Sequence, residues 1–169
     1  VSCTSCSLTR VDTSMRVDGR DVTLSDTLLS RPYFRSVLSI RNAHFTKTHF
    51  DEATFAGPVS FPALKGSDLK VTNAEFKDSV VFRSATLKSV TFENVTFAGD
   101  VEFDDAVITS TRFVNVTFSS AASFTGAKIK SSIFENVVFK QRVQSKHTEL
   151  SPNTQFINCS FPGTSSFVY

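Results

Sequence analysis

One group of residues in the chain has the types that suit metal binding. His44 and His49 are five residues apart and are followed by Asp51 and Glu52. Imidazole nitrogens and carboxylate oxygens are common ligands of metal ions. Each histidine directly precedes a phenylalanine of the repeat described below, which points the two rings outward on different sides of the fold. We therefore favour solvated histidines, and we expect no metal and no cofactor.

A second group has the oxygen ligands that calcium prefers. Asp100, Glu102, Asp104 and Asp105 surround Phe103. A solvated acidic face is the simpler interpretation, and we favour it. The sequence contains no nucleophile-elbow, zinc-protease or phosphate-loop motif. We therefore expect no catalytic residues and no enzymatic activity.

The cysteines leave several interpretations open. Cys3 and Cys6 form a CxxC pair, but no second CxxC and no pair of histidines completes a zinc site. The residues could be small buried hydrophobic side chains, which we favour, or form a Cys3–Cys6 disulfide, or pair with a neighbouring chain. Cys159 lies at the other end of the chain, too far from Cys3 and Cys6 for a bond within one molecule.

Three sequons could accept N-linked glycans, and this favours an extracellular or luminal location. They begin at Asn94, Asn115 and Asn158. Their spacing offers a second explanation. Asparagines stacked ~4.8 Å apart can form a hydrogen-bonded ladder, and Asn also suits a sharp corner. We favour the ladder as their main role and leave glycosylation open, above all at the end member Asn158. The predicted ladder comprises Asn73, Asn94, Asn115, Asn136 and Asn158.

The elements that would position these residues are indicated by a lattice of apolar positions. It advances in steps of five, five, five and six residues, a period of 21, and all eighteen phenylalanines fall on it. Self-similarity at a fixed period indicates stacked repeats that share one core. The middle of the lattice reads Phe76, Phe82, Leu87, Phe92, Phe97, Phe103, Ile108, Phe113, Phe118, Phe124, Ile129, Phe134 and Phe139.

A second set of residues lies two positions before the lattice and is mostly small or β-branched. Examples are Ala74, Val80, Ala85, Val90 and Val95. Residues two apart share one face of an extended strand. Each short strand is therefore expected to turn one small and one large side chain inward, with Phe97, Phe118 and Phe139 in one column and Phe92, Phe113 and Phe134 in the next.

These five-residue units resemble the pentapeptide-repeat family. The motif of a small residue, a polar residue and a central Leu or Phe is matched by Asn73-Ala74-Glu75-Phe76-Lys77 and Ser89-Val90-Thr91-Phe92-Glu93. The resemblance implies an all-β fold, a right-handed quadrilateral parallel β-helix with 21-residue coils and about seven to eight coils. We expect one domain over residues 1–169, with irregular stretches at 62–71 and 146–155. In the first, we expect a leucine to fill the space above Gly66.

Composition excludes several classes of function. The formal net charge is +2, and the basic residues alternate with acidic ones. Binding to a phosphate backbone requires a concentrated basic stripe, so we expect no nucleic-acid partner. No apolar run is long enough to span a bilayer, so we expect no membrane insertion of this segment.

Three functions follow as alternatives. We favour a structural or self-associating scaffold that stacks end to end, with a second copy or another protein as partner. The second is a luminal or extracellular domain of a larger membrane protein that binds protein or glycan. Its Phe-rich runs, such as Phe92 to Phe97, are similar to the luminal domain of synaptic vesicle glycoproteins. The third is a gyrase-protecting DNA mimic, which the net charge of +2 disfavours.

Overall fold

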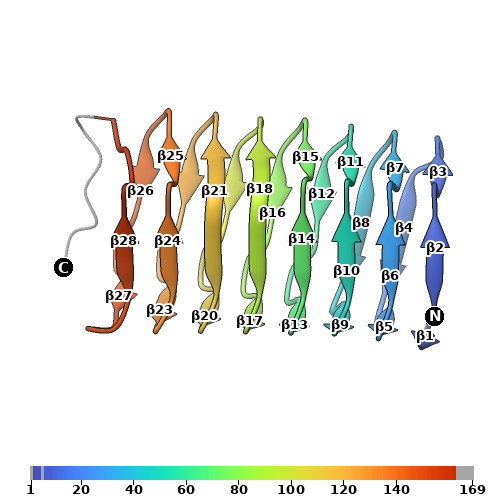
Figure 1. Ribbon diagram of the computed structural model, residues 1–169, viewed down its shortest axis with the longest axis horizontal. Helices are drawn as coiled ribbons and strands as arrows, with labels where there is room; N and C mark the ends of the chain where they lie inside the picture. Colours follow the sequence, from blue (N-terminus) through green and yellow to red (C-terminus); the bar gives the residue numbers. More distant parts are fainter. Residues whose placement is uncertain (1, 5, 163–169) are drawn as a thin grey trace.

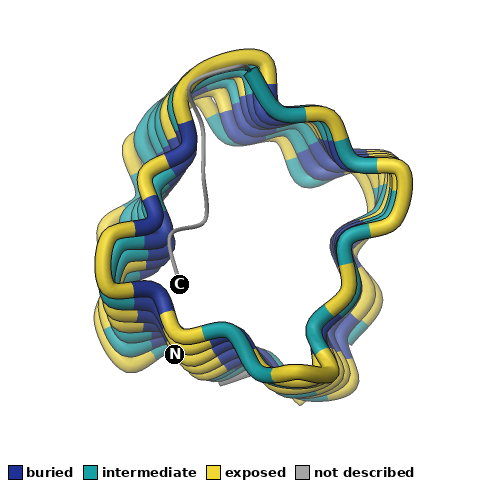
Figure 2. Tube along the Cα trace, turned by 90° about the vertical axis from the view of Figure 1, so that its left-hand side faces the viewer, coloured by how far each residue is buried: buried dark blue, intermediate teal, exposed yellow. Residues whose placement is uncertain are grey.

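The computed structural model describes residues 2–4 and 6–162, and in them the chain winds as a β-solenoid (Figure 1). The predicted all-β fold with coils of about 21 residues is confirmed, since strands in neighbouring coils pair in parallel at this spacing. Phe50, for example, pairs with Leu29 in one direction and with Val71 in the other. Viewed down its long axis, the molecule shows coils superimposed around a common core (Figure 2).

The strands form four rows, which we number as sides 1 to 4 in chain order. Side 1 is an eight-stranded sheet. Its strands are β1 (Ser2–Thr4), β5 (Thr23–Ser25), β9 (His44–Thr46), β13 (Lys65–Ser67), β17 (Thr86–Lys88), β20 (Val107–Thr109), β23 (Lys128–Lys130) and β27 (Glu149–Leu150). Side 4 is a seven-stranded sheet. Its strands are β4 (Val17–Arg20), β8 (Leu38–Arg41), β12 (Val59–Ser60), β16 (Val80–Val81), β19 (Val101–Glu102), β22 (Ala122–Ser123) and β26 (Val143–Gln144).

Sides 2 and 3 belong to one thirteen-stranded sheet because β18 (Thr91–Phe97) and β21 (Arg112–Phe118) run through both. Side 2 also contains β2 (Ser7–Thr9), β6 (Leu28–Ser30), β10 (His49–Asp51), β14 (Lys70–Thr72), β24 (Ile133–Glu135) and β28 (Gln155–Ile157). Side 3 also contains β3 (Asp12–Thr13), β7 (Tyr33–Phe34), β11 (Thr54–Phe55), β15 (Glu75–Phe76) and β25 (Val138–Phe139). No helix in the described ranges has the length and apolar character needed to cross a membrane.

Columns of phenylalanine fill the core as predicted. On side 3 the ring of Phe118 stacks at 5.1 Å from Phe97 and at 4.7 Å from Phe139, centroid to centroid. On side 2 the ring of Phe113 stacks between Phe92 at 5.0 Å and Phe134 at 4.6 Å. Offset stacking adds to the apolar burial of each ring, which alone contributes about 1.5–3 kcal/mol.

Three of the four corners turn through residues in the left-handed backbone region. At the corner between sides 2 and 3 these residues include Asn94 (φ 54°) and Asn115 (φ 53°). Asn, Asp and Ser tolerate this region better than most residues, and they dominate the three corners. The corner between sides 3 and 4 carries the sixth residue of each coil and has no such residue among those described. There the coils approach closely, and a Cβ on Gly99 would lie 2.4 Å from the carbonyl carbon of Asp78.

The two stretches expected to be irregular differ from each other. Residues 62–71 keep a regular backbone, because β13 and β14 pair in register with the coils on both sides. The departure there is in the side chains: Leu69 lies next to Gly66, with its Cδ2 3.4 Å from where a Cβ would be. In residues 146–155, the number of residues between paired positions in successive coils changes. It is 21 for β27, where Lys128 pairs with Glu149, and 22 for β28, where Ile133 pairs with Gln155. The extra residue therefore lies in the corner around Pro152.

Candidate functional site: a polar row along one corner

The row of asparagines lies along the corner between sides 2 and 3. Each residue follows the last outward-facing residue of a side 2 strand and turns the chain onto side 3. The left-handed backbone presents each exposed side chain along the solenoid axis, toward the same residue of the next coil. We call these residues the Asn row: Asn73, Asn94, Asn115, Asn136 and Asn158.

The amides of the Asn row form a continuous chain of hydrogen bonds with one direction. Asn94 donates its Nδ2 to Asn73 Oδ1 at 3.1 Å, and Asn115 donates to Asn94 at 3.0 Å. Asn136 donates to Asn115 at 3.1 Å, and Asn158 donates to Asn136 at 3.3 Å. Every N–H therefore points toward the N-terminal end of the solenoid, and the amide dipoles add.

The donor end of the row terminates on a carboxylate. Asn73 donates its Nδ2 to Asp51 Oδ1 at 3.1 Å, and the Thr72 hydroxyl donates to the same oxygen at 2.5 Å. The Thr72 bond is the main cause of a lowered pKa at Asp51; partial desolvation opposes it, and the bond from Asn73 adds to it. The negative charge thus lies at the positive end of the aligned amides.

His49 completes this network from the same strand as Asp51. Its Nε2 lies 2.8 Å from the Thr72 hydroxyl oxygen. Since that hydroxyl donates its proton to Asp51, it accepts from His49, and the imidazole does not act as a base toward it. The arrangement orients the Thr72 hydroxyl between His49 and Asp51.

The row of corner residues continues toward the N-terminus with charged side chains. Glu52 and Arg31 occupy the same corner in the two preceding coils, and their side chains form an ion pair of 2.7 Å. Both side chains are about half exposed, so solvent screens this ion pair. Along this corner, the ion pair of Arg31 and Glu52 is followed by the amide hydrogen bonds of the Asn row, which begins at the contact of Asn73 with Asp51.

The residues considered as metal ligands are only partly brought together. His49 and Asp51 meet through Thr72, whereas His44 lies on side 1 with its Nδ1 3.1 Å from the Asn42 carbonyl oxygen. Within residues 2–4 and 6–162, no three His, Cys, Asp or Glu side chains are placed to hold a metal ion.

The acidic residues around Phe103 bond to neighbouring coils. Asp104 Oδ1 accepts from the Ser123 hydroxyl at 2.5 Å, and Asp100 Oδ1 accepts from the Ala121 N–H at 3.1 Å. Glu102 forms an ion pair of 2.9 Å with Arg83. These carboxylates therefore hold adjacent coils together.

The cysteines behave differently at the two ends. Cys6 is disulfide-bonded, so its interpretation as a free buried thiol is wrong. The side chain of Cys3 lies outside the described part of the structure. Cys159 is a free, half-buried thiol whose Sγ lies 3.3 Å from the Phe134 carbonyl oxygen. Burial is the main cause of the raised pKa of Cys159, so the thiolate is disfavoured.

Sequence reasoning missed two features of this region. One is the end of the Asn row at Asp51, which is 22 residues before Asn73 and so lies outside the 21-residue period. The other is a column of hydroxyls at buried small-residue positions of side 2. Thr48, for example, donates to the Leu24 carbonyl at 3.1 Å. A search for Ser and Thr at the small-residue positions would have found this column.

Comparison with known proteins identifies the repeat. Residues 72–116 match the family model "Pentapeptide repeats (9 copies)", which confirms the resemblance seen in the sequence. No curated protein sequence matches the chain. The similarity to the luminal domain of synaptic vesicle glycoproteins has no support in these comparisons.

Three solved structures are among those that resemble this chain at low sequence identity. Full-length QnrB1, a plasmid-mediated fluoroquinolone resistance protein, is 10% identical with a TM-score of 0.33, covering 90% of this chain and 94% of its own. HetL, a pentapeptide-repeat protein involved in heterocyst differentiation regulation in the cyanobacterium Nostoc, is 12% identical with a TM-score of 0.24, covering 95% and 84%. Rfr23 from the cyanobacterium Cyanothece is 12% identical with a TM-score of 0.21, covering 92% and 90%.

Proposed function

Since residues 72–116 are pentapeptide repeats within a continuous β-solenoid, we propose that the chain is a non-enzymatic scaffold that binds another protein or a second copy of itself. The observation that carries this proposal is the regular pairing of equivalent residues in successive coils. Outward side chains recur at one coil spacing over a closely packed core, as in the pairing of β18 with β21. A rigid surface with regular columns suits extended contacts with a partner of matching spacing.

The polar groups of the candidate site support a structural role. The Thr72 hydroxyl is committed to Asp51, and the Asn row uses its amides for bonds between coils. Asp100 and Asp104 likewise accept hydrogen bonds from the next coil. Hydrogen bonds between coils of this kind stabilise the stack.

End-to-end stacking is the form of self-association that the strand pattern favours. Among the described strands, β2 pairs with β6 on one edge, and no described strand pairs with its other edge. Leu8, at a core position of this strand, is 40% exposed. A second solenoid stacked on this end would pair with the free edge of β2 and cover Leu8. Because such a head-to-tail contact can be repeated from one molecule to the next, it would build a filament rather than a closed oligomer.

Sedimentation velocity over a concentration series tests this proposal, with electron microscopy of the same samples. We expect a reversible rise in mass with concentration and short rods of solenoid width. Leu8→Arg should weaken the association, whereas Leu28→Arg should not. The control residue is 39% exposed, close to Leu8, but it points outward from the wall of side 2. A monomer at all concentrations, or equal effects of both variants, would contradict end-to-end stacking.

The second candidate is an extracellular or luminal domain that binds protein or glycan. The disulfide at Cys6 favours it, because disulfides persist in oxidising compartments. The sequons at Asn94, Asn115 and Asn158 agree with this location. Secretion from a eukaryotic host, followed by intact-mass measurement before and after glycan removal, tests it. Secreted chains with glycan mass support the location, and retention or unmodified mass opposes it.

The third candidate is protection of gyrase by DNA mimicry, and charge argues against it. A DNA mimic needs a strongly acidic surface, and this chain has a formal net charge of +2. A supercoiling assay with gyrase and a fluoroquinolone provides the test. We expect no rescue of gyrase activity by this chain.

A further inference from the structure

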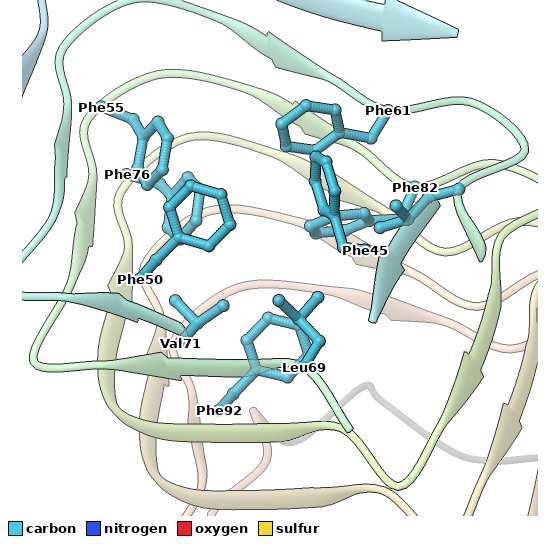
Figure 3. Close-up of a pocket in the computed structure, with 10 residues that line it drawn as sticks. Phe45, Phe50, Phe55, Phe61, Leu69, Val71, Phe76, Phe82 and Phe92 are labelled. Carbon is cyan, nitrogen blue, oxygen red and sulfur yellow. The ribbon is translucent and has the colours of Figure 1, made fainter. Parts of the chain in front are cut away.

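A cavity lies inside the solenoid where one coil lacks two large core residues (Figure 3). Gly66 takes the core position that Phe45 holds one coil earlier, and Val71 takes the position of Phe50. Two bulky rings are therefore replaced by a hydrogen atom and an isopropyl group in the same coil, on adjacent sides of the core.

Two leucines refill this space only in part. Leu64 stands at a position that holds alanine or valine in most coils, and Leu69 stands at one that otherwise holds threonine, serine or valine in the middle coils. The two leucines are 1% and 3% exposed. Leu69 lies beside Gly66, and Leu64 also lines the cavity. Figure 3 shows Leu69 and Val71 on one side of the opening, with Phe45 and Phe50 across it. The replacement leaves a hole at the centre of the coil.

The size of the hole sets the size of a ligand. The space open to the centre of a water molecule is about 20 Å³. A sphere of that volume has a radius of about 1.7 Å, and adding the ~1.4 Å radius of water gives a hole of about 3 Å radius. This space accepts a xenon atom or a hydrocarbon of two or three carbons, and it is too small for a phenyl ring.

The chemistry of the lining excludes polar ligands. All lining residues are apolar, and no polar atom faces the hole. An ordered water molecule needs two to four polar partners, and none is present to provide them. An apolar guest, in contrast, would gain dispersion contacts with seven phenylalanine rings that now face empty space: Phe45, Phe50, Phe55, Phe61, Phe76, Phe82 and Phe92.

We propose that this cavity is a binding site for one small, uncharged, apolar molecule. The site is independent of the scaffold function, because it lies in the core and uses no surface residue. Access requires only transient local opening of the coils, which is common in folded proteins.

Xenon is the probe for this site. Methyl NMR spectra of the intact chain would be recorded under increasing xenon pressure. We expect saturable shifts of the methyl groups of Leu64, Leu69 and Val71. The methyl groups of Val116 serve as the internal control, because this valine is 0% exposed and does not line the cavity. Linear shifts of equal size at all four residues, or no shifts at all, would overturn the proposal.

Substitutions at Val71 provide the matched test. Val71→Phe restores the side chain found at this core position in the neighbouring coils, and it should abolish the saturable shifts of Leu64 and Leu69. Val71→Leu fills less of the hole and preserves folding if phenylalanine overpacks it. It should weaken xenon binding at least several-fold. Val71→Ala should enlarge the hole and extend binding to hydrocarbons of more than three carbons. Unchanged xenon binding in the leucine variant would show that the ligand occupies another place.

Discussion

Each inner residue of the Asn row satisfies two conditions at once. Its backbone turns through the left-handed region, and its side chain bonds along the axis to the coils on both sides. Asn meets both conditions because its short amide tolerates this backbone and carries one donor and one acceptor for the row. Asn115 shows this most clearly, since it donates to Asn94 and accepts from Asn136.

Replacing Asn115 with alanine should lower the free energy of unfolding by about 2–5 kcal/mol, the sum of about 1–3 kcal/mol for two hydrogen bonds and about 1–2 kcal/mol for backbone strain. Two hydrogen bonds of about 0.5–1.5 kcal/mol each are lost, and alanine is strained at φ 53°. Urea unfolding of protein made without glycosylation measures the change. Asn115→Gly is the matched control: it loses the same bonds without the strain and should cost less. A loss confined to glycosylated material would contradict a structural role for the Asn row.

Asp51 should make stability depend on pH. Its pKa is lower in the folded state, mainly because Thr72 donates to it. Such a group stabilises the fold above the unfolded pKa of about 3.9 and loses this effect as the pH falls through the folded pKa. Asp51→Asn should therefore remove part of the fall in melting temperature below pH 4. Identical pH profiles for the variant and the parent chain would disprove this coupling.

At the residue scale, the sequence predicted spacing better than contacts. The period places Asn94 and Asn115 in equivalent positions, so their stacking follows from the repeat alone. Asn73 and Asp51 are 22 residues apart, one more than the period, so the repeat alone does not predict their contact. The disulfide at Cys6 depends on local geometry and oxidation, and the sequence left it as one of three interpretations.

At the scale of the elements, strands of two to seven residues are too short to be stable alone. They persist because each Phe column continues through the coils before and after it. The period of 21 predicted these columns, because residues 21 apart take the same position in successive coils and their rings therefore stack. The loss of volume at Gly66 and Val71 was visible in the sequence only as a break in the pattern. Whether leucines refill the hole depends on side-chain packing.

Phe118→Ala should lower the free energy of unfolding by about 3–5 kcal/mol, because the cavity in the middle of a stacked column cannot collapse. The ring is 0% exposed and stacks on both Phe97 and Phe139. Chemical denaturation measures the loss. Val107→Ala is the control on an outward position, 36% exposed, and should change stability by less than about 0.5 kcal/mol. A melting temperature unchanged by Phe118→Ala would refute a columnar core.

For the whole molecule, packing changes along the axis. In the middle coils, core residues such as Phe113 and Phe124 are 0% exposed. In the first coil, Leu8 is 40% exposed, and the lattice positions on sides 3 and 4 hold Thr13 and Gly19. Stability in a solenoid is a sum of coil and interface contributions, so it should follow the same trend.

Amide hydrogen exchange should reveal this gradient. We expect the slowest exchange in β18 and β21, which form the longest pair, and the fastest in β2 to β4. Mass spectrometry of peptides from the exchanged chain gives the order. Equal protection along the axis would indicate a single cooperative unit instead.

The extra residue near Pro152 shows where this fold can vary in length. The partner spacing changes from 21 to 22 there, yet Phe156 still stacks 4.7 Å from Phe134. The turn closes with a hydrogen bond of 2.9 Å from the Thr154 N–H to the Ser151 carbonyl, and it absorbs the addition. A corner can therefore gain a residue while the stacking of core side chains in successive coils stays the same. A foreign loop grafted at this corner would therefore be displayed on the surface without disturbing the β-sheets of the solenoid.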